Sequence, residues 1–344
     1  MPVRKIHRLF LLGGSIFLFA VTGCNPDTKL TPAFKDYRGN GSGEEIEGVE
    51  RHDPFATLRL VTNAPSLSIK AYTNFSTAWI NAATVRVWVD GKEAKFFHLK
   101  STGEETLELP LPGPGKHQVD LVEGTQMNEG EYSAHSFTSI RQVATPAGYH
   151  TRVVTPTKAA VGIVAFTDSR GLGGGYEDGS IYAWPVQLAR GKGADVYLTG
   201  YCSLQAGAHL ATLAGRKRIT DEIAQRLHGY AHQRVYCQVG VNDYSYATYT
   251  PVQLQRYLRD WLTGLRKALP GAKVYLLTDG PKADESRNAL GFTLPQYRDA
   301  EAAGAAGLTQ VIDGNSLWTL ADLQDGTHLS KTGDTKVAAK LSLL

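Results

Sequence analysis

The stretch VGIVAFTDSRG, residues 161–171, decides the fold of the second half of this chain, because an uninterrupted apolar run stops there at small and polar residues. Such a run is typical of a strand that is buried on both faces of a parallel sheet. Four similar runs follow, at 194–198, 235–239, 274–277 and 308–312. Because stretches of helical periodicity separate these runs, we predict a parallel, doubly wound α/β sheet over residues 156–344.

The clearest helical stretch follows Thr250 and Pro251, which are typical of an N-cap and a first-turn residue. A last helix is expected from about Asp334 to Leu341. The apolar positions that predict the first of these helices are Leu254, Leu258, Trp261, Leu262, Leu265 and Leu269.

Residues 55–155 have the two-residue periodicity of β-strands instead. Val85, Val87 and Val89 alternate with other residues, and Asp90-Gly91 then supplies a tight hairpin turn. Short strands at this spacing predict an all-β sandwich of about a hundred residues. The further alternating stretches lie at 58–61, 67–72, 107–111, 119–121 and 137–143.

The first 24 residues belong to neither domain. Basic residues precede the apolar run 9–20, which is too short to span a membrane as a stable helix. The run ends in Val-Thr-Gly directly before Cys24, which resembles the lipobox signal of bacterial lipoproteins. The resemblance implies a lipid on Cys24 that anchors the chain to a bacterial membrane, in the cell envelope, facing the periplasm or the exterior. An ordinary signal peptide that contains a cysteine is the alternative.

Residues 25–54 are rich in Gly, Asn, Asp, Glu and Pro, a composition that cannot bury a core and predicts a flexible tether. Three of the 36 Lys and Arg residues lie in residues 1–23, so the remaining chain has 33 basic and 33 acidic residues. This balance does not indicate a nucleic-acid partner, and we expect none.

Cys202 and Cys237 are the other cysteines, and no His, Cys, Asp or Glu cluster has metal-ligand spacing. Cys202 follows the second predicted strand, and Cys237 lies in the third. In the usual order of such a sheet the first strand separates the two chains by roughly 10 Å, whereas a disulfide needs Cα atoms within about 7 Å. We therefore expect two free thiols, no metal and no cofactor.

Polar and small residues follow the predicted strands. Ser169 comes after the first strand, Gly200 after the second, and Gly240-Val241-Asn242-Asp243 after the third. Asp325-Gly326-Thr327-His328 precedes the last helix. Taken singly, such segments serve as helix caps, turns or surface pairs. Because the carboxyl ends of parallel strands meet at one edge of a sheet, we expect these four segments to lie close together.

Together these residues are what acyl transfer requires. A serine hydroxyl is a weak nucleophile until a neutral imidazole accepts its proton, and a carboxylate orients that imidazole. We therefore predict a catalytic triad of Ser169, His328 and Asp325. The oxyanion needs hydrogen-bond donors, which we assign to the backbone amides of Ser169 and Gly200 and to the Asn242 side chain. The expected supporting residues are Asp168, Gly240 and Asp243.

At these positions the sequence resembles the SGNH (GDSL-type) hydrolase superfamily, over about residues 160–344. Thr167-Asp168-Ser169, with Gly173 after it, matches the Gly-Asp-Ser block, and Gly200 matches the second-block glycine. Residues 240–243 match the Gly-x-Asn-Asp block, and 325–328 match the final Asp-x-x-His. The resemblance implies a flavodoxin-like, five-stranded, doubly wound sheet and a carboxylic ester hydrolase.

The serine block departs from the family at two positions. Thr167 stands where the family usually has glycine, and Arg170 replaces a usual apolar residue. If position 167 takes a positive φ angle, a β-branched residue is strained there. We therefore expect the serine loop to differ slightly, with an effect on the level of activity rather than on the type of reaction.

The β domain resembles the N-terminal jelly roll of the second carbohydrate-esterase family at residues 87–91 and 115–124. That family pairs a sandwich with an SGNH domain and removes acetyl groups from polysaccharides. Aromatic residues near the predicted site serve either as a platform for sugar rings or as packing under loops. They are Trp184, Tyr201, Tyr244, Tyr246, Tyr249 and Trp318, of which Trp184, Tyr201 and Tyr244 are the candidate substrate contacts.

Three functions agree with these patterns. The first is an esterase that removes O-acyl groups, most simply acetyl, from carbohydrate. The second keeps the same catalytic residues but acts on a lipid ester or a thioester. The third is a non-catalytic surface lipoprotein that binds glycans through its sandwich. The presence of Ser169, Asn242, Asp325 and His328 favours the two enzymes over the third.

Overall fold

The structure of the protein, a computed structural model, describes most of the chain from residue 57 onward and two short strands before it. The predicted lipobox, with Cys24, lies outside the described residues, as do Tyr201 and Cys202. The described ranges are 35–38, 44–47, 57–74, 84–99, 102–123, 137–154, 158–174, 179–200 and 204–344.

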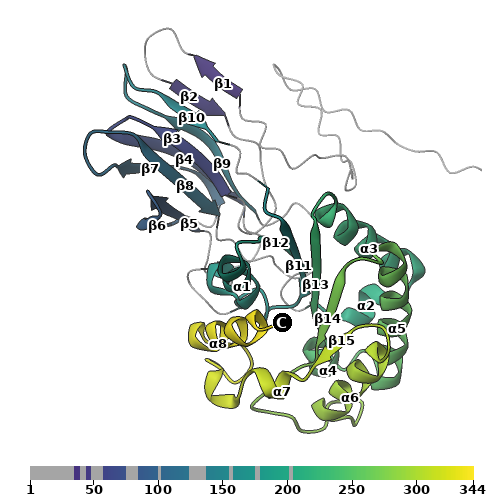
Figure 1. The fold of residues 1–344 in the computed structure, drawn as a ribbon. Helices are drawn as coiled ribbons and strands as arrows, with labels where there is room; N and C mark the ends of the chain where they lie inside the picture. The colour runs from purple at the N-terminus through teal and green to yellow at the C-terminus, as the bar shows by residue number, and fades with distance from the viewer. Residues whose placement is uncertain are drawn as a thin grey trace, which may run out of the picture. The chain divides into compact units, whose positions relative to one another are not determined.

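The predicted sandwich is confirmed as two antiparallel sheets (Figure 1). One sheet has the strand order β1-β2-β9-β4-β7 and the other has the order β10-β3-β8-β5-β6. The strands are β3 (Thr57–Thr62), β4 (Ser66–Asn74), β5 (Thr84–Val89), β6 (Lys92–His98), β7 (Thr102–Pro110), β8 (His117–Glu123), β9 (Phe137–Ala144) and β10 (Thr151–Val153). Apolar side chains from both sheets, such as Leu60, Ile69, Val87 and Leu109, form one buried core.

The hairpin that the sequence predicts at Asp90-Gly91 joins β5 to β6. Both residues have positive φ angles, of 52° and 79°. Two consecutive residues with positive φ are the mark of the tight turn that matches the twist of a hairpin.

The segment 25–54 contains more structure than the predicted tether. β1 (Lys35–Arg38) pairs with β2 (Glu44–Glu47), and β2 pairs with β9 at the edge of a sandwich sheet. Strand pairing at a sheet edge uses backbone hydrogen bonds, so it requires no apolar side chains. The polar composition of this segment therefore did not indicate the two strands.

The predicted doubly wound sheet is also confirmed (Figure 1). Its five parallel strands lie in the flavodoxin-like order β12-β11-β13-β14-β15. Each connection between strands that are consecutive in the chain includes a helix, as the alternating pattern predicts. The strands are β11 (Val161–Thr167), β12 (Asp195–Gly200), β13 (His232–Gln238), β14 (Lys273–Leu277) and β15 (Gln310–Ile312).

Helices cover both faces of this sheet. The longer ones are α1 (Trp184–Lys192), α3 (Leu213–Leu227), α5 (Pro251–Ala268), α6 (Leu294–Ala305) and α8 (Lys331–Ser342). The shorter ones are η1 (Gly179–Tyr182), α2 (Ala206–Leu210), α4 (Val241–Tyr246), α7 (Gly314–Leu317) and η2 (Leu320–Asp322). Thr250 caps α5 in a capping box and Pro251 opens it, as the sequence predicts. The last helix, α8, begins three residues before the predicted start, because Ser330 provides its cap.

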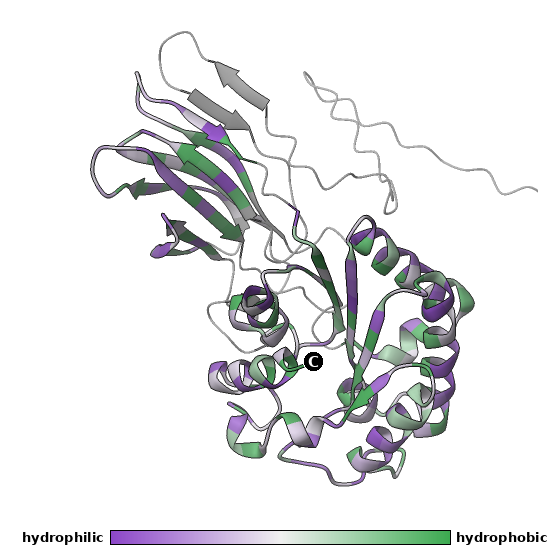
Figure 2. Ribbon diagram, in the orientation of Figure 1, coloured by the Kyte–Doolittle hydropathy of each residue, from purple (hydrophilic) through white to green (hydrophobic). Residues whose placement is uncertain are grey.

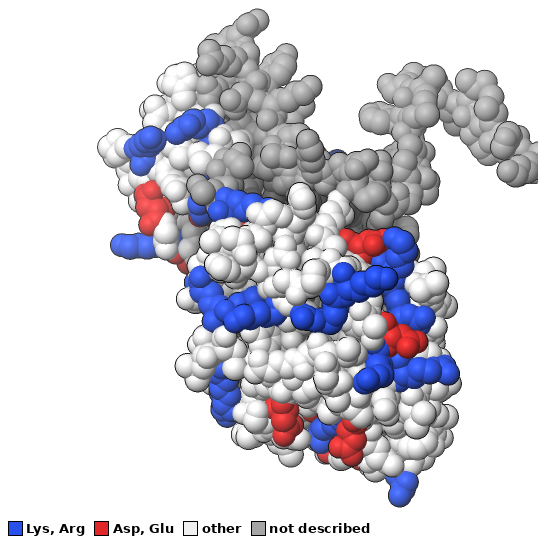
Figure 3. Space-filling model, turned by 45° about the vertical axis from the view of Figure 1, so that its right-hand side comes forward, with Lys and Arg blue, Asp and Glu red and all other residues white. Residues whose placement is uncertain are grey.

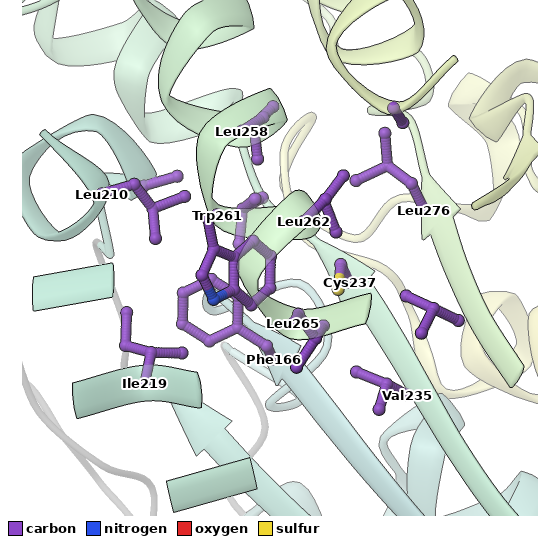
Figure 4. Packing of buried hydrophobic residues seen from close by; sticks show 14 of the residues in the cluster. Phe166, Leu210, Ile219, Val235, Cys237, Leu258, Trp261, Leu262, Leu265 and Leu276 are labelled. Carbon is purple, nitrogen blue, oxygen red and sulfur yellow. The ribbon is translucent and has the colours of Figure 1, made fainter. Parts of the chain in front are cut away.

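The first strand, β11, contributes to two cores because alternate residues point to opposite faces. Val164 and Phe166 join the core beneath α3 and α5, whereas Ile163 and Ala165 join the core beneath α1 and α8. In Figure 4 the Phe166 ring lies beside the Trp261 indole, with ring centroids 5.1 Å apart. In Figure 2 the ribbon of β11 has mostly the hydrophobic colour, whereas the helices around the sheet have mixed colours.

Basic residues occupy the last turns of α1, α3, α5 and α8, where they complement the partial negative charge of a helix C-terminus. Figure 3 shows Lys and Arg side chains gathered in a band across one face of the molecule. In a sheet of this kind the helix C-termini lie at the edge opposite the carboxyl ends of the strands. The last-turn residues are Arg190, Lys192, Arg226, Arg266, Lys267 and Lys340.

Candidate active site

Ser169 lies two residues beyond the end of β11, in a tight turn that we call the serine loop (residues 168–174). The backbone amides of Gly171 and Leu172 both donate to the Asp168 carbonyl, and the Gly174 amide donates to the Ser169 carbonyl at 2.7 Å. The turn leaves Ser169 with an exposed fraction of 7%. The buried strand and the turn together hold the serine in one place.

His328 and Asp325 lie in a segment that we call the histidine loop (residues 325–328), just before α8. Ser169 Oγ lies 2.9 Å from His328 Nε2, and His328 Nδ1 lies 2.7 Å from Asp325 Oδ2. If Nδ1–H donates to the carboxylate, Nε2 is left to accept the serine proton. The structure therefore brings the three predicted side chains together as a continuous hydrogen-bonded relay.

The Asp325 carboxylate is held by more than the imidazole. Its Oδ1 accepts hydrogen bonds from the backbone amides of Thr327 at 2.9 Å and His328 at 2.7 Å. Partial burial pushes the pKa of Asp325 up, but the hydrogen bonds from the His328 ring and these two amides outweigh it and lower the pKa. Asp325 is therefore ionised at neutral pH and can stabilise an imidazolium.

Thr167 does not take the positive φ angle that would strain a β-branched residue. Among the described residues only Asp90 and Ala247 have a positive φ without being glycine. Thr167 is the last residue of β11 and is paired with Gly200 of β12 and with Gln238 of β13. Because extended backbone suits a β-branched side chain, the condition under which Thr167 would be strained is not met.

Gly200 ends β12 at a point where two strands approach closely. Its φ is 139°, and a Cβ atom built on it would lie 1.9 Å from the Thr167 carbonyl oxygen. Only glycine avoids this overlap. Gly200 is therefore required for steric reasons, independently of the predicted role of its backbone amide as an oxyanion donor.

The segment 240–243 turns from β13 into α4. Asn242 Nδ2 donates to the Leu204 carbonyl at 3.2 Å, which fixes the side-chain amide and uses one of its two N–H groups. Asp243 is fully buried and accepts the backbone amides of Ala206 and Gly207, each at 2.8 Å. Asp243 therefore ties the start of α2 to the same edge of the sheet.

The backbone of Gly240 packs closely against the buried side chain of Glu301. Its φ is 134°, and a Cβ atom there would lie 1.9 Å from Glu301 Oε1. Glu301 Oε2 accepts the backbone amide of Asp279 at 2.9 Å. Asp168, Asp243, Asp279 and Glu301 are all completely buried, so the sheet edge below the relay holds four carboxyl groups.

Burial controls the ionisation of these carboxyl groups. Desolvation, reinforced by the nearby charge of Asp279, raises the pKa of Asp168 from 3.8 to about 8, and desolvation raises the pKa of Asp243 to about 7. Desolvation also raises the pKa of Asp279 and of Glu301. The folded protein therefore holds protons on Asp168 and Asp243 that the unfolded chain releases near pH 4.

These shifts predict a stability that falls as pH rises. Between about pH 4 and 8 the folded state binds more protons than the unfolded chain, so the free energy of unfolding decreases with pH. In the wild type the backbone amide of Arg170 donates to Asp168 Oδ1 at 2.9 Å. Asp168→Asn removes the titrating proton but keeps a side-chain oxygen that can accept this hydrogen bond. We expect the slope of unfolding free energy against pH to become shallower by about 1 kcal/mol per pH unit between pH 5 and 7.

Urea unfolding of the two proteins at several pH values measures this slope. Asp284→Asn is the matched control, because Asp284 has a lowered pKa and titrates below the window. Equal slopes for the wild type and Asp168→Asn would show that Asp168 is ionised in the folded protein.

Two residues that support the relay were not predicted. A Cβ atom on Gly174 would lie 2.9 Å from both His328 Cδ2 and Ser169 Cβ, so only glycine fits against the serine–histidine pair. Gln324 Nε2 donates to the Gly174 carbonyl at 2.8 Å, and the Gln324 amide donates to the His328 carbonyl at 2.9 Å. The glycine run at 173–175 was the signal in the sequence that could have indicated this close approach.

Of the two roles left open for the aromatic residues near the site, a sugar platform or packing, the structure shows packing for most of those it describes. Trp184 is fully buried and donates to Gln238 Oε1 at 2.7 Å, so its assignment as a substrate contact was wrong. Tyr244 is 4% exposed and donates to the Ser286 carbonyl at 2.7 Å, so its assignment as a substrate contact was wrong too. Trp318 is also buried. Tyr246 is 49% exposed and Tyr249 is half-buried. The side-chain direction of an aromatic residue is not set by its place after a strand, so the sequence could not separate these cases.

Cys237 is a free, buried cysteine, and burial raises the pKa of its thiol above the usual range. Because Cys202 is not described, the expectation of two free thiols stays a prediction.

Among the described residues no three His, Cys, Asp or Glu side chains are grouped as a metal site requires. In the same part of the chain no helix combines the length and hydrophobicity needed to cross a bilayer.

The sandwich followed by a five-stranded, doubly wound sheet is a fold that solved structures share. No protein-family model matches the chain, and no curated protein matches its sequence. Solved structures do match, and the similarity extends over both the sandwich and the α/β domain, because it covers up to 91% of this chain. At identities of 12–17% this similarity defines the fold.

Three of these structures are named here. A family two carbohydrate esterase from Cellvibrio japonicus is 13% identical with a TM-score of 0.61, covering 91% of this chain and 94% of its own. A putative GDSL-like lipase from Bacteroides ovatus is 12% identical with a TM-score of 0.61, covering 88% and 83%. The salicylyl-acyltransferase SsfX3 from a tetracycline biosynthetic pathway is 17% identical with a TM-score of 0.61, covering 83% and 80%.

Proposed function

We propose that this protein is a serine esterase that hydrolyses O-acyl esters, most simply acetyl esters, on carbohydrate. The observation that carries the proposal is the relay from Ser169 Oγ through His328 to Asp325, with distances of 2.9 and 2.7 Å. It lies on a fold whose solved examples include esterases, a GDSL-like lipase and an acyltransferase.

The reaction begins when His328 Nε2 takes the Ser169 proton as the serine oxygen attacks the ester carbonyl. The tetrahedral intermediate collapses, the protonated His328 gives its proton to the departing sugar oxygen, and an acyl group remains on Ser169. Water then attacks this acyl-enzyme with His328 again accepting the proton, which releases the carboxylic acid and restores the serine. Asp325, ionised and bonded to Nδ1, stabilises the imidazolium in both steps.

We assign the oxyanion of each intermediate to three donors: the backbone amides of Ser169 and Gly200 and the Asn242 side chain. Gly200 is paired with Thr167 in the register of the sheet, which supports its position beside the serine loop. The bond from Asn242 to the Leu204 carbonyl supports a fixed direction for its amide. Fixed donors stabilise the oxyanion without reorganisation during the reaction.

The choice of carbohydrate rests on the sandwich as well as on the α/β domain. The similarity to a family two carbohydrate esterase covers both domains and nearly the whole length of each chain. A GDSL-like lipase and an acyltransferase match equally well by TM-score, so a lipid ester or thioester is the second candidate. A glycan-binding protein without catalysis is the third.

One assay series separates these candidates. We expect release of acetate from acetylated polysaccharide and turnover of nitrophenyl acetate, with slow turnover of long-chain nitrophenyl esters. We also expect full activity in the presence of a chelator, because the proposed relay needs no ion. Preference for long chains would favour the lipid candidate, and chelator-sensitive activity that a divalent metal restores would contradict the triad chemistry.

For location we propose that a lipid on Cys24 anchors the protein to a bacterial membrane in the cell envelope. The support is the Val-Thr-Gly-Cys sequence that follows the apolar run 9–20. Mass spectrometry of the N-terminal peptide from the native host would detect a diacylglyceryl cysteine, and an unmodified N-terminus elsewhere in the chain would refute the anchor.

A further inference from the structure

Arg170 follows Ser169 directly and is completely buried, as is its partner Asp279. Arg170 Nη1 lies 3.1 Å from Asp279 Oδ1, which is two residues beyond the end of β14. The guanidinium also lies over the Trp318 indole, with Cζ 5.7 Å from the ring centroid. A buried guanidinium is rare unless it is paired, and here the pair is supplied by a different strand end.

The same guanidinium reaches the histidine loop. Arg170 Nε donates to the carbonyl oxygen of Thr327 at 3.0 Å, and Thr327 precedes His328 in the chain. The planar guanidinium can make this bond and the ion pair with Asp279 at once, because its N–H groups point in fixed and different directions. One side chain therefore joins the serine loop, the histidine loop and the end of β14.

Packing alone does not require an arginine at this position. An aliphatic side chain would fill the space without the cost of removing a charge from water, and buried ion pairs are often replaced by apolar residues without loss of stability. What an aliphatic side chain cannot do is donate to Thr327. The hydrogen bond from Arg170 Nε to the Thr327 carbonyl needs a donor, and it restrains the residue that precedes His328.

We propose that Arg170 is a positioning residue that holds His328 at the distance and angle needed to take the proton of Ser169. This inference rests on the proposed esterase function. Arg170 acts through the Thr327 carbonyl, and Asp279 holds the guanidinium in the orientation that this requires. A base displaced by about 1 Å typically costs on the order of 10²-fold in rate.

The test compares Arg170→Met and Arg170→Lys with the wild type on nitrophenyl acetate. Met fills the space and removes every donor, whereas Lys keeps the charge beside Asp279 but lacks the forked geometry. We expect kcat per active serine to fall about 10²-fold in Arg170→Met and about tenfold in Arg170→Lys, with KM within twofold of the wild type. A fluorophosphonate that labels Ser169 to completion counts the active serines.

Arg86→Met is the matched control, since it removes a buried arginine that pairs with Glu93 and donates to Tyr182, neither of which lies in the serine or histidine loop. We expect its kcat on nitrophenyl acetate to stay within twofold of the wild type. If Arg170→Met does not fold, as thermal unfolding and circular dichroism would show, Arg170→Lys decides the question. A kcat per active serine within twofold of the wild type in the folded variants, or a loss confined to KM, would overturn the proposal.

Ser169→Ala in the same experiment separates this inference from the function on which it rests. If the wild type is no more active than Ser169→Ala, the proposed function fails. If the wild type is active and the folded Arg170 variants match it, the function stands and the positioning role fails.

Discussion

Replacing Ser169 or His328 by alanine is expected to lower kcat/KM on any ester by a factor on the order of 10⁴ or more. Ser169 Oγ and His328 Nε2 are within hydrogen-bond distance, and each is useless to the reaction without the other. The double variant should therefore be no worse than either single one, because the two residues act as a unit. Initial rates on nitrophenyl acetate measure this directly.

Asp325→Asn should cost less than either alanine variant. The Asp325 side chain is half exposed, so water can replace part of the charge stabilisation that the carboxylate provides. Its two backbone hydrogen bonds also keep a partner, since the amide oxygen of asparagine accepts them. Unchanged activity in folded Ser169→Ala would show that another residue is the nucleophile.

Gly200→Ala has the second large expected effect, and it acts on the folded structure itself. A methyl group at this position would overlap the Thr167 carbonyl oxygen at 1.9 Å, and alanine would also be strained at a φ of 139°. The strands β11 and β12 would have to separate beside the serine loop. We expect a loss of about 3 kcal/mol or more in the free energy of unfolding, or no soluble protein.

Gly191→Ala provides the comparison for that result. Gly191 is a helical residue of α1 with open space around its Cα, so alanine there should leave stability unchanged or raise it by up to about 1 kcal/mol. Equilibrium unfolding in urea measures both variants. Wild-type stability in Gly200→Ala would mean that β11 and β12 do not approach as closely as described.

Local patterns predicted most of the fold. The apolar runs predicted all five strands of the parallel sheet, and Thr250 with Pro251 predicted the start of α5. The strand β10 was not predicted, since it has only 3 residues, and it lies at the edge of its sheet. A strand this short cannot show an alternation of apolar and polar residues over the roughly four to eight positions that such a prediction needs. The division of the β-strands between two sheets depends on long-range pairing, which no local pattern reports.

In the candidate site, too, some features could be predicted from local sequence and others depend on long-range contacts. Ser169, Asp325 and His328 could be proposed from the sequence because acyl transfer demands particular side chains in short, recognisable segments, and the structure places the three within hydrogen-bond distance. Arg170 and Trp184 could not be interpreted in that way, because what matters is the direction of the side chain. The Arg170 guanidinium reaches across to Asp279, and the Trp184 indole lies in the core. Sequence position indicates neither.

The bond between Ser169 and His328 closes a loop of 159 residues, whereas Asp325 and His328 are only three residues apart. The strands β12, β13, β14 and β15 all lie within that loop. Closing a loop of this length costs chain entropy that only the ordered intervening structure offsets. The proposed proton transfer therefore depends on the whole parallel sheet, so we expect a variant that unfolds any of these strands to lose turnover even though its three candidate catalytic residues are intact.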